Sequence, residues 1–234
     1  MTVTRGEGLT KWYGEVMGLN RFTASFEEGI TGLVGPNGAG KSTFFKLAMG
    51  QLIQDEGTLE VLGERPWNNR ELMAHIGYCP EHNRVYGYMT GLRFVTTLLR
   101  LSGYSKKEAS QRAEETMKLV NMQDDMNRPL AGYSKGMRQR TKLAQALAHE
   151  PRLLILDEPL NGTDPVGRVH MINVIRSLPE KGVSAIISSH ILFEVERLTD
   201  QVVLINRGKA IASGQIQEIR RLIDEHPHTV VLTT

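Results

Sequence analysis

The nine-residue stretch "GPNGAGKST" has the residue types that hold a phosphate group. It matches the phosphate-loop pattern GxxxxGK[ST], in which glycines let consecutive backbone N–H groups turn toward phosphate oxygens. A helix that begins at its end would add a positive N-terminus. The lysine would balance the charge of the β and γ phosphates of a nucleotide, and the serine hydroxyl would bind Mg²⁺. The residues predicted to bind the nucleotide here are Gly35, Pro36, Asn37, Gly38, Ala39, Gly40, Lys41, Ser42 and Thr43.

Two adjacent acids follow an apolar run in "LLILDEPLNGTDP". The apolar residues carry Asp157 and Glu158 to the end of a predicted buried strand, where α/β sheets place their ligand sites. Asp157 is predicted to hold the Mg²⁺ shell, and Glu158 to be the general base that polarises an attacking water. Such acids are often only solvated loop residues. The phosphate loop upstream favours the catalytic interpretation.

Two further features suit phosphate chemistry. His190 ends the apolar run "SAIISSH", and a lone histidine there is usually structural. As the end of a third buried strand, it would lie toward the γ phosphate, where an imidazole can orient water. The stretch "AGYSKGMRQR" also combines small residues, a serine and basic residues at the start of a predicted helix. The sequence therefore has a second set of phosphate-seeking groups far from the first.

The elements that must position these residues alternate between short strands and helices. Apolar runs of strand length at 30–35, 153–158 and 184–190 predict a parallel sheet covered on both faces. Residues 90–150 instead indicate successive helices with no strand between them, one of which begins at Ser105 with a capping box to Glu108. The run after Gln201 predicts a hairpin and then a helix, and "TVVLTT" predicts a terminal strand. We therefore expect an α/β fold with a helical lobe inserted into a mainly parallel core.

The amino-acid composition argues against several classes of function. The 234 residues carry 28 basic and 26 acidic side chains, a balance that argues against broad contact with nucleic acid. One cysteine, Cys79, excludes an internal disulfide. No segment approaches the ~20 apolar residues of a membrane-spanning helix. We therefore expect a soluble protein that reaches any membrane through a partner.

Together these motifs resemble the ATPase cassette of ATP-binding cassette (ABC) transporters, from about Leu9 to Gln217. The resemblance makes "GPNGAGKST" the Walker A motif, "LLILDE" the Walker B motif and "NGTD" the D-loop. It makes His190 the switch histidine and aligns "YSKGM" with the family signature LSGGQ. Ser134 and Gly136 would then contact the γ phosphate bound by a second chain. Tyr13 lies where the family stacks adenine, although Tyr13 or Trp12 could equally be core residues.

Two departures from the family pattern stand out. The signature keeps Ser134 and Gly136 but has Tyr133, Lys135 and Met137 where Leu, Gly and Gln are commonest. The Q-loop glutamine is replaced by Glu81, which can bind Mg²⁺ or water but cannot donate the hydrogen bonds of an amide.

The resemblance implies an ATP-hydrolysing, Mg²⁺-dependent subunit that closes as an ATP-sandwich dimer on a transmembrane permease subunit. It is nearest to exporter-type cassettes for drugs, polysaccharides or copper-associated factors, and it implies a peripheral position on the cytoplasmic face of the membrane. Apolar residues near the Q-loop, such as Val85, Tyr86 and Met89, would receive a helix of that subunit or pack as ordinary lobe core. The alternative is an ABC-type ATPase that acts on a ribosome or nucleic acid. The presence of Glu158 and His190 argues against a cassette that binds ATP without hydrolysing it.

The implied domain organisation is a single ABC ATPase domain over 1–234. Its core would comprise 1–89 and 151–217, and its helical lobe about 90–150. Residues 218–234 would begin a C-terminal extension.

Overall fold

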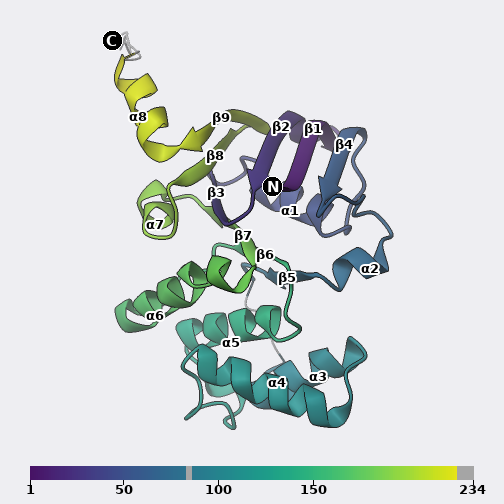
Figure 1. Ribbon diagram of the computed structural model, residues 1–234, viewed down its shortest axis with the longest axis vertical. Coiled ribbons are helices and arrows are strands. Elements are labelled where there is room, and N and C mark those ends of the chain that lie inside the picture. Colours follow the sequence, from purple (N-terminus) through teal and green to yellow (C-terminus); the bar gives the residue numbers. More distant parts are fainter. Residues whose placement is uncertain (83–85, 226–234) are drawn as a thin grey trace.

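The strands form two sheets, which occupy the upper and middle parts of the molecule in the view of Figure 1. The computed structural model describes residues 1–82 and 86–225. The strands are β1 (Thr2–Tyr13), β2 (Val16–Glu27), β3 (Ile30–Val34), β4 (Glu56–Val61), β5 (Ile76–Cys79), β6 (Leu153–Asp157), β7 (Ser184–Ser189), β8 (Gln201–Asn206) and β9 (Lys209–Gln215).

The candidate functional residues lie at the carboxyl ends of central strands of the larger sheet. Its order is β5-β6-β7-β3-β8-β9, and every pairing is parallel except that of β8 with β9. Strands β3, β6 and β7 are buried along their whole length, as their continuous apolar runs predict. In the register, Val34 pairs with Ser189, and Asp157 pairs with Ser188. The carboxyl ends of these three strands therefore lie together.

The smaller sheet is antiparallel, with the order β2-β1-β4. Strands β1 and β2 form a long hairpin, and its turn contains Gly14 at a φ of +61°. The expected fold class is confirmed: a mainly parallel core, an N-terminal antiparallel region and an inserted helical lobe.

The helical lobe lies between β5 and β6 in the sequence and at the opposite end of the molecule from the small sheet (Figure 1). Residues 91–147 contain helices and no named strand. Ser105 and Glu108 form the predicted reciprocal capping box. The helices are α1 (Lys41–Ala48), α2 (Arg70–Met73), α3 (Gly91–Leu101), α4 (Lys106–Leu119), α5 (Lys135–Leu147), α6 (Pro165–Arg176), α7 (Leu192–Glu196) and α8 (Ile216–Glu225).

Helix α1 is fixed in the core by aromatic rings. Phe44 lies 5.0 Å from Phe22 and 5.1 Å from Phe26 between ring centroids, and Phe45 is also fully buried. Burying one such ring stabilises the fold by about 1.5–3 kcal/mol. The packing of Phe44 and Phe45 therefore holds the helix that follows the glycine-rich loop.

Strands β8 and β9 form the predicted hairpin, and its turn residues Arg207 and Gly208 both have positive φ. Helix α8 follows the hairpin, as predicted. The predicted strand "TVVLTT" and Val85 lie outside the described residues. Each described helix is too short or too polar to cross a lipid bilayer.

Candidate active site

The glycine-rich loop connects the end of β3 to the start of α1. Gly40, the residue before α1, has a φ of +112°, and a Cβ there would lie 2.7 Å from the carbonyl oxygen of Gly18. Only glycine fits that position. The first backbone N–H groups of a helix have no partner within it, and no side chain caps α1. The start of α1 is therefore suited to bind an anion.

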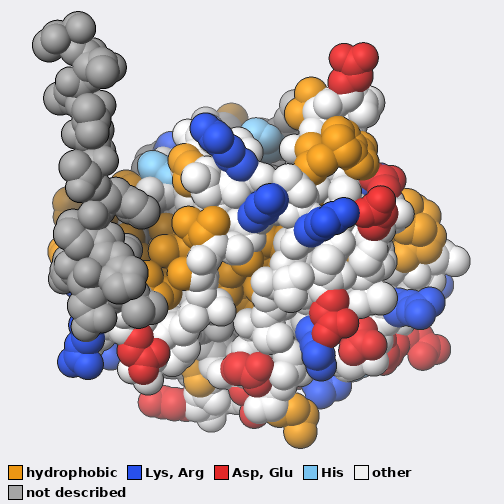
Figure 2. Space-filling model, turned by 90° about the horizontal axis from the view of Figure 1, so that it is seen from above, with side chains coloured by type: hydrophobic (Ala, Val, Ile, Leu, Met, Phe, Trp, Pro, Cys, Tyr) orange, Lys and Arg blue, Asp and Glu red, His pale blue; other side chains and the backbone are white. Residues whose placement is uncertain are grey.

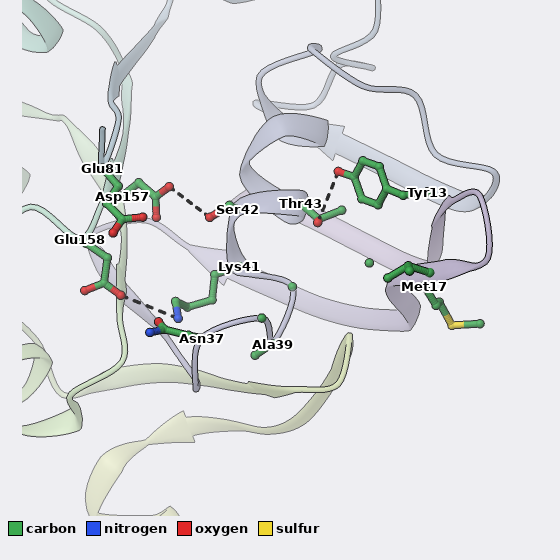
Figure 3. Close-up of a pocket in the computed structure, with 14 residues that line it drawn as sticks. Tyr13, Met17, Asn37, Ala39, Lys41, Ser42, Thr43, Glu81, Asp157 and Glu158 are labelled. Atoms are coloured by element: carbon green, nitrogen blue, oxygen red, sulfur yellow. Dashed lines mark hydrogen bonds and ion pairs between the residues drawn. The ribbon is translucent and has the colours of Figure 1, made fainter. Parts of the chain in front are cut away.

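The ammonium of Lys41 lies across this loop. It donates to the carbonyl oxygens of Gly35 at 2.7 Å and Pro36 at 3.2 Å, and it lies 3.7 Å from a carboxylate oxygen of Glu158 (Figure 3). The Lys41 side chain is only 7% exposed. This cation is held at the junction between the loop and the end of β6.

Asp157 accepts hydrogen bonds from two serines. The hydroxyl of Ser42 donates to one carboxylate oxygen at 3.3 Å, and that of Ser188 donates to the other at 2.6 Å. Burial raises the pKa of Asp157, and both hydrogen bonds oppose that rise. A carboxylate beside a hydroxyl offers oxygen ligands suited to Mg²⁺, which commonly takes one or two carboxylates together with substrate phosphates. The donor set therefore fits that ion.

Glu81 lies beside Asp157 and lines the same cavity (Figure 3). Its negative charge contributes to the raised pKa of Asp157. Among the described residues, no group of three or more His, Cys, Asp or Glu side chains could hold a metal by itself. The oxygen ligands that remain for an ion here would have to come from phosphate and water.

Glu158 sits between two basic side chains. The Nδ1 atom of His190 lies 3.1 Å from each carboxylate oxygen of Glu158, and Lys41 approaches from the other side. Burial raises the pKa of Glu158, and His190 and Lys41 oppose the rise. The backbone of Glu158 has a φ of +49°, a strained conformation that costs about 1–3 kcal/mol outside glycine. The surrounding structure holds this carboxylate in a conformation that the chain alone would not favour.

Ser188 connects the two acids, and sequence reasoning missed it. Its fully buried hydroxyl accepts from the N–H of Glu158 at 2.9 Å while it donates to Asp157. The sequence signal was the position of Ser188, two residues before His190 at the end of a buried strand. A serine there is too common to be singled out without the pairing of β6 and β7.

The glycine-rich loop, the start of α1 and the carboxylates of Glu81, Asp157 and Glu158 line a cavity of about 430 Å³ between the loop and the hairpin of β1 and β2 (Figure 3). Tyr13 lines it, and its hydroxyl lies 3.5 Å from the Thr43 hydroxyl. Tyr13 and Trp12 are both 43% exposed, so neither is a core residue. The cavity is lined by Tyr13, Val16, Met17, Gly18, Asn37, Gly38, Ala39, Gly40, Lys41, Ser42, Thr43, Glu81, Asp157 and Glu158. Sequence reasoning did not identify the three residues from Val16 to Gly18.

The signature residues lie elsewhere. Ser134 caps α5 by accepting from the N–H of Met137, and Gly136 packs against Thr163 and Asp164. Lys135 donates to the side chain of Asn161 at 3.1 Å. Neither Ser134 nor Gly136 lines the cavity of its own chain. The structure thus brings together the phosphate loop, the two acids and His190, but not the signature.

Comparison with known proteins agrees with this geometry. A family model described as "ABC transporter" matches residues 19–161. The uncharacterized ABC transporter ATP-binding protein YxlF of Bacillus subtilis (strain 168) is 38% identical over 195 residues, which are 83% of this chain and 64% of that protein. The bacitracin transport ATP-binding protein BcrA of Bacillus licheniformis is 36% identical over 223 residues, which are 94% of this chain and 72% of that protein. The chain spans 62–64% of the length of YxlF and two other relatives.

Solved structures share the fold. The structure of an ATP binding subunit of an ABC transporter superposes with a TM-score of 0.85 at 26% identity, covering 97% of this chain and 96% of that one. A dimeric post-hydrolysis structure of the cassette MJ0796, bound to ADP and Pi, has a TM-score of 0.82 at 20% identity, covering 91% of this chain and 98% of that one. The phosphate loop, the paired acids and the family match lead to one conclusion: the chain belongs to the ABC transporter family, of which it is an ATP-binding cassette.

Proposed function

We propose that the chain binds ATP with Mg²⁺ and hydrolyses it as the nucleotide-binding subunit of an exporter. The observation that carries the proposal is the convergence of four groups at one cavity. Lys41 and Ser42 come from the start of α1, and Asp157 and Glu158 come from the end of β6. A cation, a metal-binding hydroxyl and two carboxylates at a glycine-rich loop are the groups that phosphoryl transfer requires.

Each residue would have a distinct role. Lys41 would exchange its loop carbonyl contacts for the β and γ phosphate oxygens. Ser42 and Asp157, with Glu81 beside them, would hold Mg²⁺, which when bound would neutralise phosphate charge. Glu158 would take the proton of the attacking water.

His190 contacts both carboxylate oxygens of Glu158, so it would fix the direction in which that base points. The proposed base is therefore already oriented by a neighbouring side chain.

We further propose that the signature of one chain completes the site of a second chain. Ser134 and Gly136 carry groups suited to phosphate, yet they lie outside the cavity of their own chain. The cassette MJ0796, whose structure has the same fold, is a dimer bound to ADP and Pi. ATP held between two chains would stabilise only the closed pair.

A transmembrane permease subunit is the proposed partner, which would place the chain on the cytoplasmic face of a membrane. Tyr86 and Tyr88 are 57% and 74% exposed beside the start of the helical lobe. Met89, in contrast, packs partly buried against the lobe core. A cavity of about 560 Å³ between core and lobe is lined by Tyr78, Tyr104 and His149, among others.

The proposed direction of transport is export. It is supported by relatives whose names refer to bacitracin transport and to multidrug transport.

The alternative, action on a ribosome or nucleic acid, has less support. Basic and acidic side chains are interspersed on the face shown in Figure 2, and the net charge of the chain is +2. Broad contact with nucleic acid phosphates favours a basic surface.

The test of the proposed function is Lys41→Ala, with Lys107→Met as an exposed control on α4. The purified chain should bind ATP by calorimetry and release phosphate in the presence of Mg²⁺. The Lys41→Ala variant should lose hydrolysis because the charge that balances the β and γ phosphates is gone. The control should behave as the parent does. Near-normal turnover by Lys41→Ala would contradict the proposal.

A further inference from the structure

Lys142, on the signature helix α5, is a buried cation outside the site described above. It is 3% exposed, whereas lysine is almost never fully buried unless its charge is paired. Burial lowers the pKa of Lys142. A buried ammonium needs hydrogen-bond acceptors for its three N–H groups.

Three consecutive carbonyl oxygens supply those acceptors. Lys142 Nζ donates to Pro80 at 2.5 Å, to Glu81 at 3.1 Å and to His82 at 3.5 Å. These residues leave the end of β5 without regular secondary structure. The ammonium therefore supplies hydrogen bonds to the main chain of a segment that no sheet or helix holds.

The held segment positions an acid of the nucleotide cavity. Glu81 is the middle residue of the three, and its side chain lies beside Asp157 (Figure 3). Glu81 has no hydrogen bond of its own to Asp157 or Ser42 among those found in the described residues. Its place in the cavity therefore depends on how its backbone is held.

The same helix carries the signature. Lys142 lies six residues after Gly136, which is about 9 Å along a helix axis. Between them, the Gln139 side chain is buried, and its Nε2 donates to the backbone oxygen of Glu158 at 3.5 Å. One face of α5 thus contacts the chain where it leaves β5 and where it leaves β6.

We propose that Lys142 is a positioning residue: it fixes Glu81 beside Asp157 for binding of Mg²⁺ with ATP, and it ties that position to the signature helix. This role rests on the proposed function, because it concerns the same nucleotide site.

A purely structural role for Lys142 makes a different prediction. If the ammonium only stabilised the fold, removing it would lower the melting temperature and weaken ATP binding with and without Mg²⁺. A positioning role through Glu81 affects the Mg²⁺-dependent part of binding alone. The effect of removing the Lys142 ammonium should also disappear when the Glu81 carboxylate is absent, because Lys142 then has no carboxylate to position.

The experiment measures ATP affinity by calorimetry in a Glu158→Gln background, first with a metal chelator and then with excess Mg²⁺. The variants are Lys142→Met, which keeps the side-chain length without the charge, and Lys142→Arg, which keeps a cation. Lys107→Met is the exposed control, and Glu81→Ala is made alone and together with Lys142→Met. Thermal denaturation of each variant shows whether it is folded.

Lys142→Met should reduce the gain in affinity from Mg²⁺ about tenfold, the scale of lost hydrogen bonds to a charged group. Its affinity with chelator should stay within about twofold of the parent. Lys142→Arg and Lys107→Met should keep most of the gain. Glu81→Ala should lower the gain at least as much as Lys142→Met does, while Ser42 and Asp157 keep part of it. Adding Lys142→Met to Glu81→Ala should then lower that remaining gain no further.

Two results would overturn the role of Lys142. One is a Lys142→Met variant that is folded and keeps the full gain from Mg²⁺. The other is an equal loss in the Glu81→Ala background, which would show that Lys142 does not act through Glu81. A parent chain that binds no ATP would instead overturn the proposed function itself, and the role of Lys142 with it.

Discussion

Ser188→Ala is the substitution that most directly tests how the two acids are held. The variant removes a fully buried hydroxyl that donates to Asp157 at 2.6 Å and accepts from the N–H of Glu158 at 2.9 Å. A hydrogen bond to a charged group contributes about 1.5–3 kcal/mol, and an unsatisfied buried N–H costs about 1–3 kcal/mol. The lower part of these ranges gives a loss of about 3 kcal/mol in the free energy of unfolding.

That loss has a measurable scale. For a domain of this size, 1 kcal/mol shifts the melting temperature by about 2–4 °C, so Ser188→Ala should melt about 6–12 °C below the parent. Ser184→Ala is the matched control, because Ser184 is a buried serine at the other end of β7 whose hydroxyl accepts one neutral backbone N–H. The control should lose about 1 kcal/mol. A Ser188→Ala variant that melts no lower than Ser184→Ala would refute the reasoning.

The same variant has a predictable pH dependence. Burial raises the pKa of Asp157, and the hydrogen bond from Ser188 opposes that rise, so the pKa should rise further in Ser188→Ala. A folded-state pKa above the unfolded value means that stability falls as pH increases and the buried carboxyl ionises. The gap in melting temperature between parent and Ser188→Ala should therefore widen from about pH 4, near the ordinary pKa of Asp, to neutral pH. Differential scanning calorimetry across that range checks the direction.

Three further outcomes follow from the site. Glu158→Gln should bind ATP normally but hydrolyse it about 100-fold or more slowly, measured as phosphate release, because the general base is lost; turnover at the parent rate would remove Glu158 from that role. A mixture of the inactive variants Lys41→Ala and Gly136→Asp should regain hydrolysis, because one site of a mixed dimer inherits neither defect. No recovery from demonstrated mixed dimers would contradict the shared site, provided that a single intact site turns over. Tyr13→Ala should weaken ATP binding about tenfold in calorimetry, because stacking of the ring on adenine is lost. Trp12→Ala should leave binding unchanged, because Trp12 does not line the cavity. Equal effects of the two substitutions would show that the ring of Tyr13 does not stack on the nucleotide.

The sequence predicted the parts of the site that depend on local spacing. The loop from Gly35 to Thr43 and the paired acids are each contiguous, so their residue types alone indicated phosphate chemistry. The strand assignments followed because β3, β6 and β7 are buried on both faces and read as continuous apolar runs.

Contacts between distant segments could not be predicted in this way. Lys142 bonds to Glu81, which is 61 residues away, and Ser188 bonds to Asp157, which is 31 residues away. A lone lysine or serine has no spacing pattern that distinguishes it from a solvated one. Tyr13 and Trp12 are neighbours of equal exposure on one strand, so only the lining of the cavity separates them.

The left-handed backbone of Glu158 has a consequence for directed evolution. Glycine at that position would relieve about 1–2 kcal/mol of backbone strain and remove a buried carboxyl group. Glycine at 158 would also leave the buried ammonium of Lys41 without its carboxylate partner, a larger cost than the strain it relieves, so the strained conformation is retained together with the proposed catalytic base. Screens that raise the stability of this cassette should hold residue 158 constant.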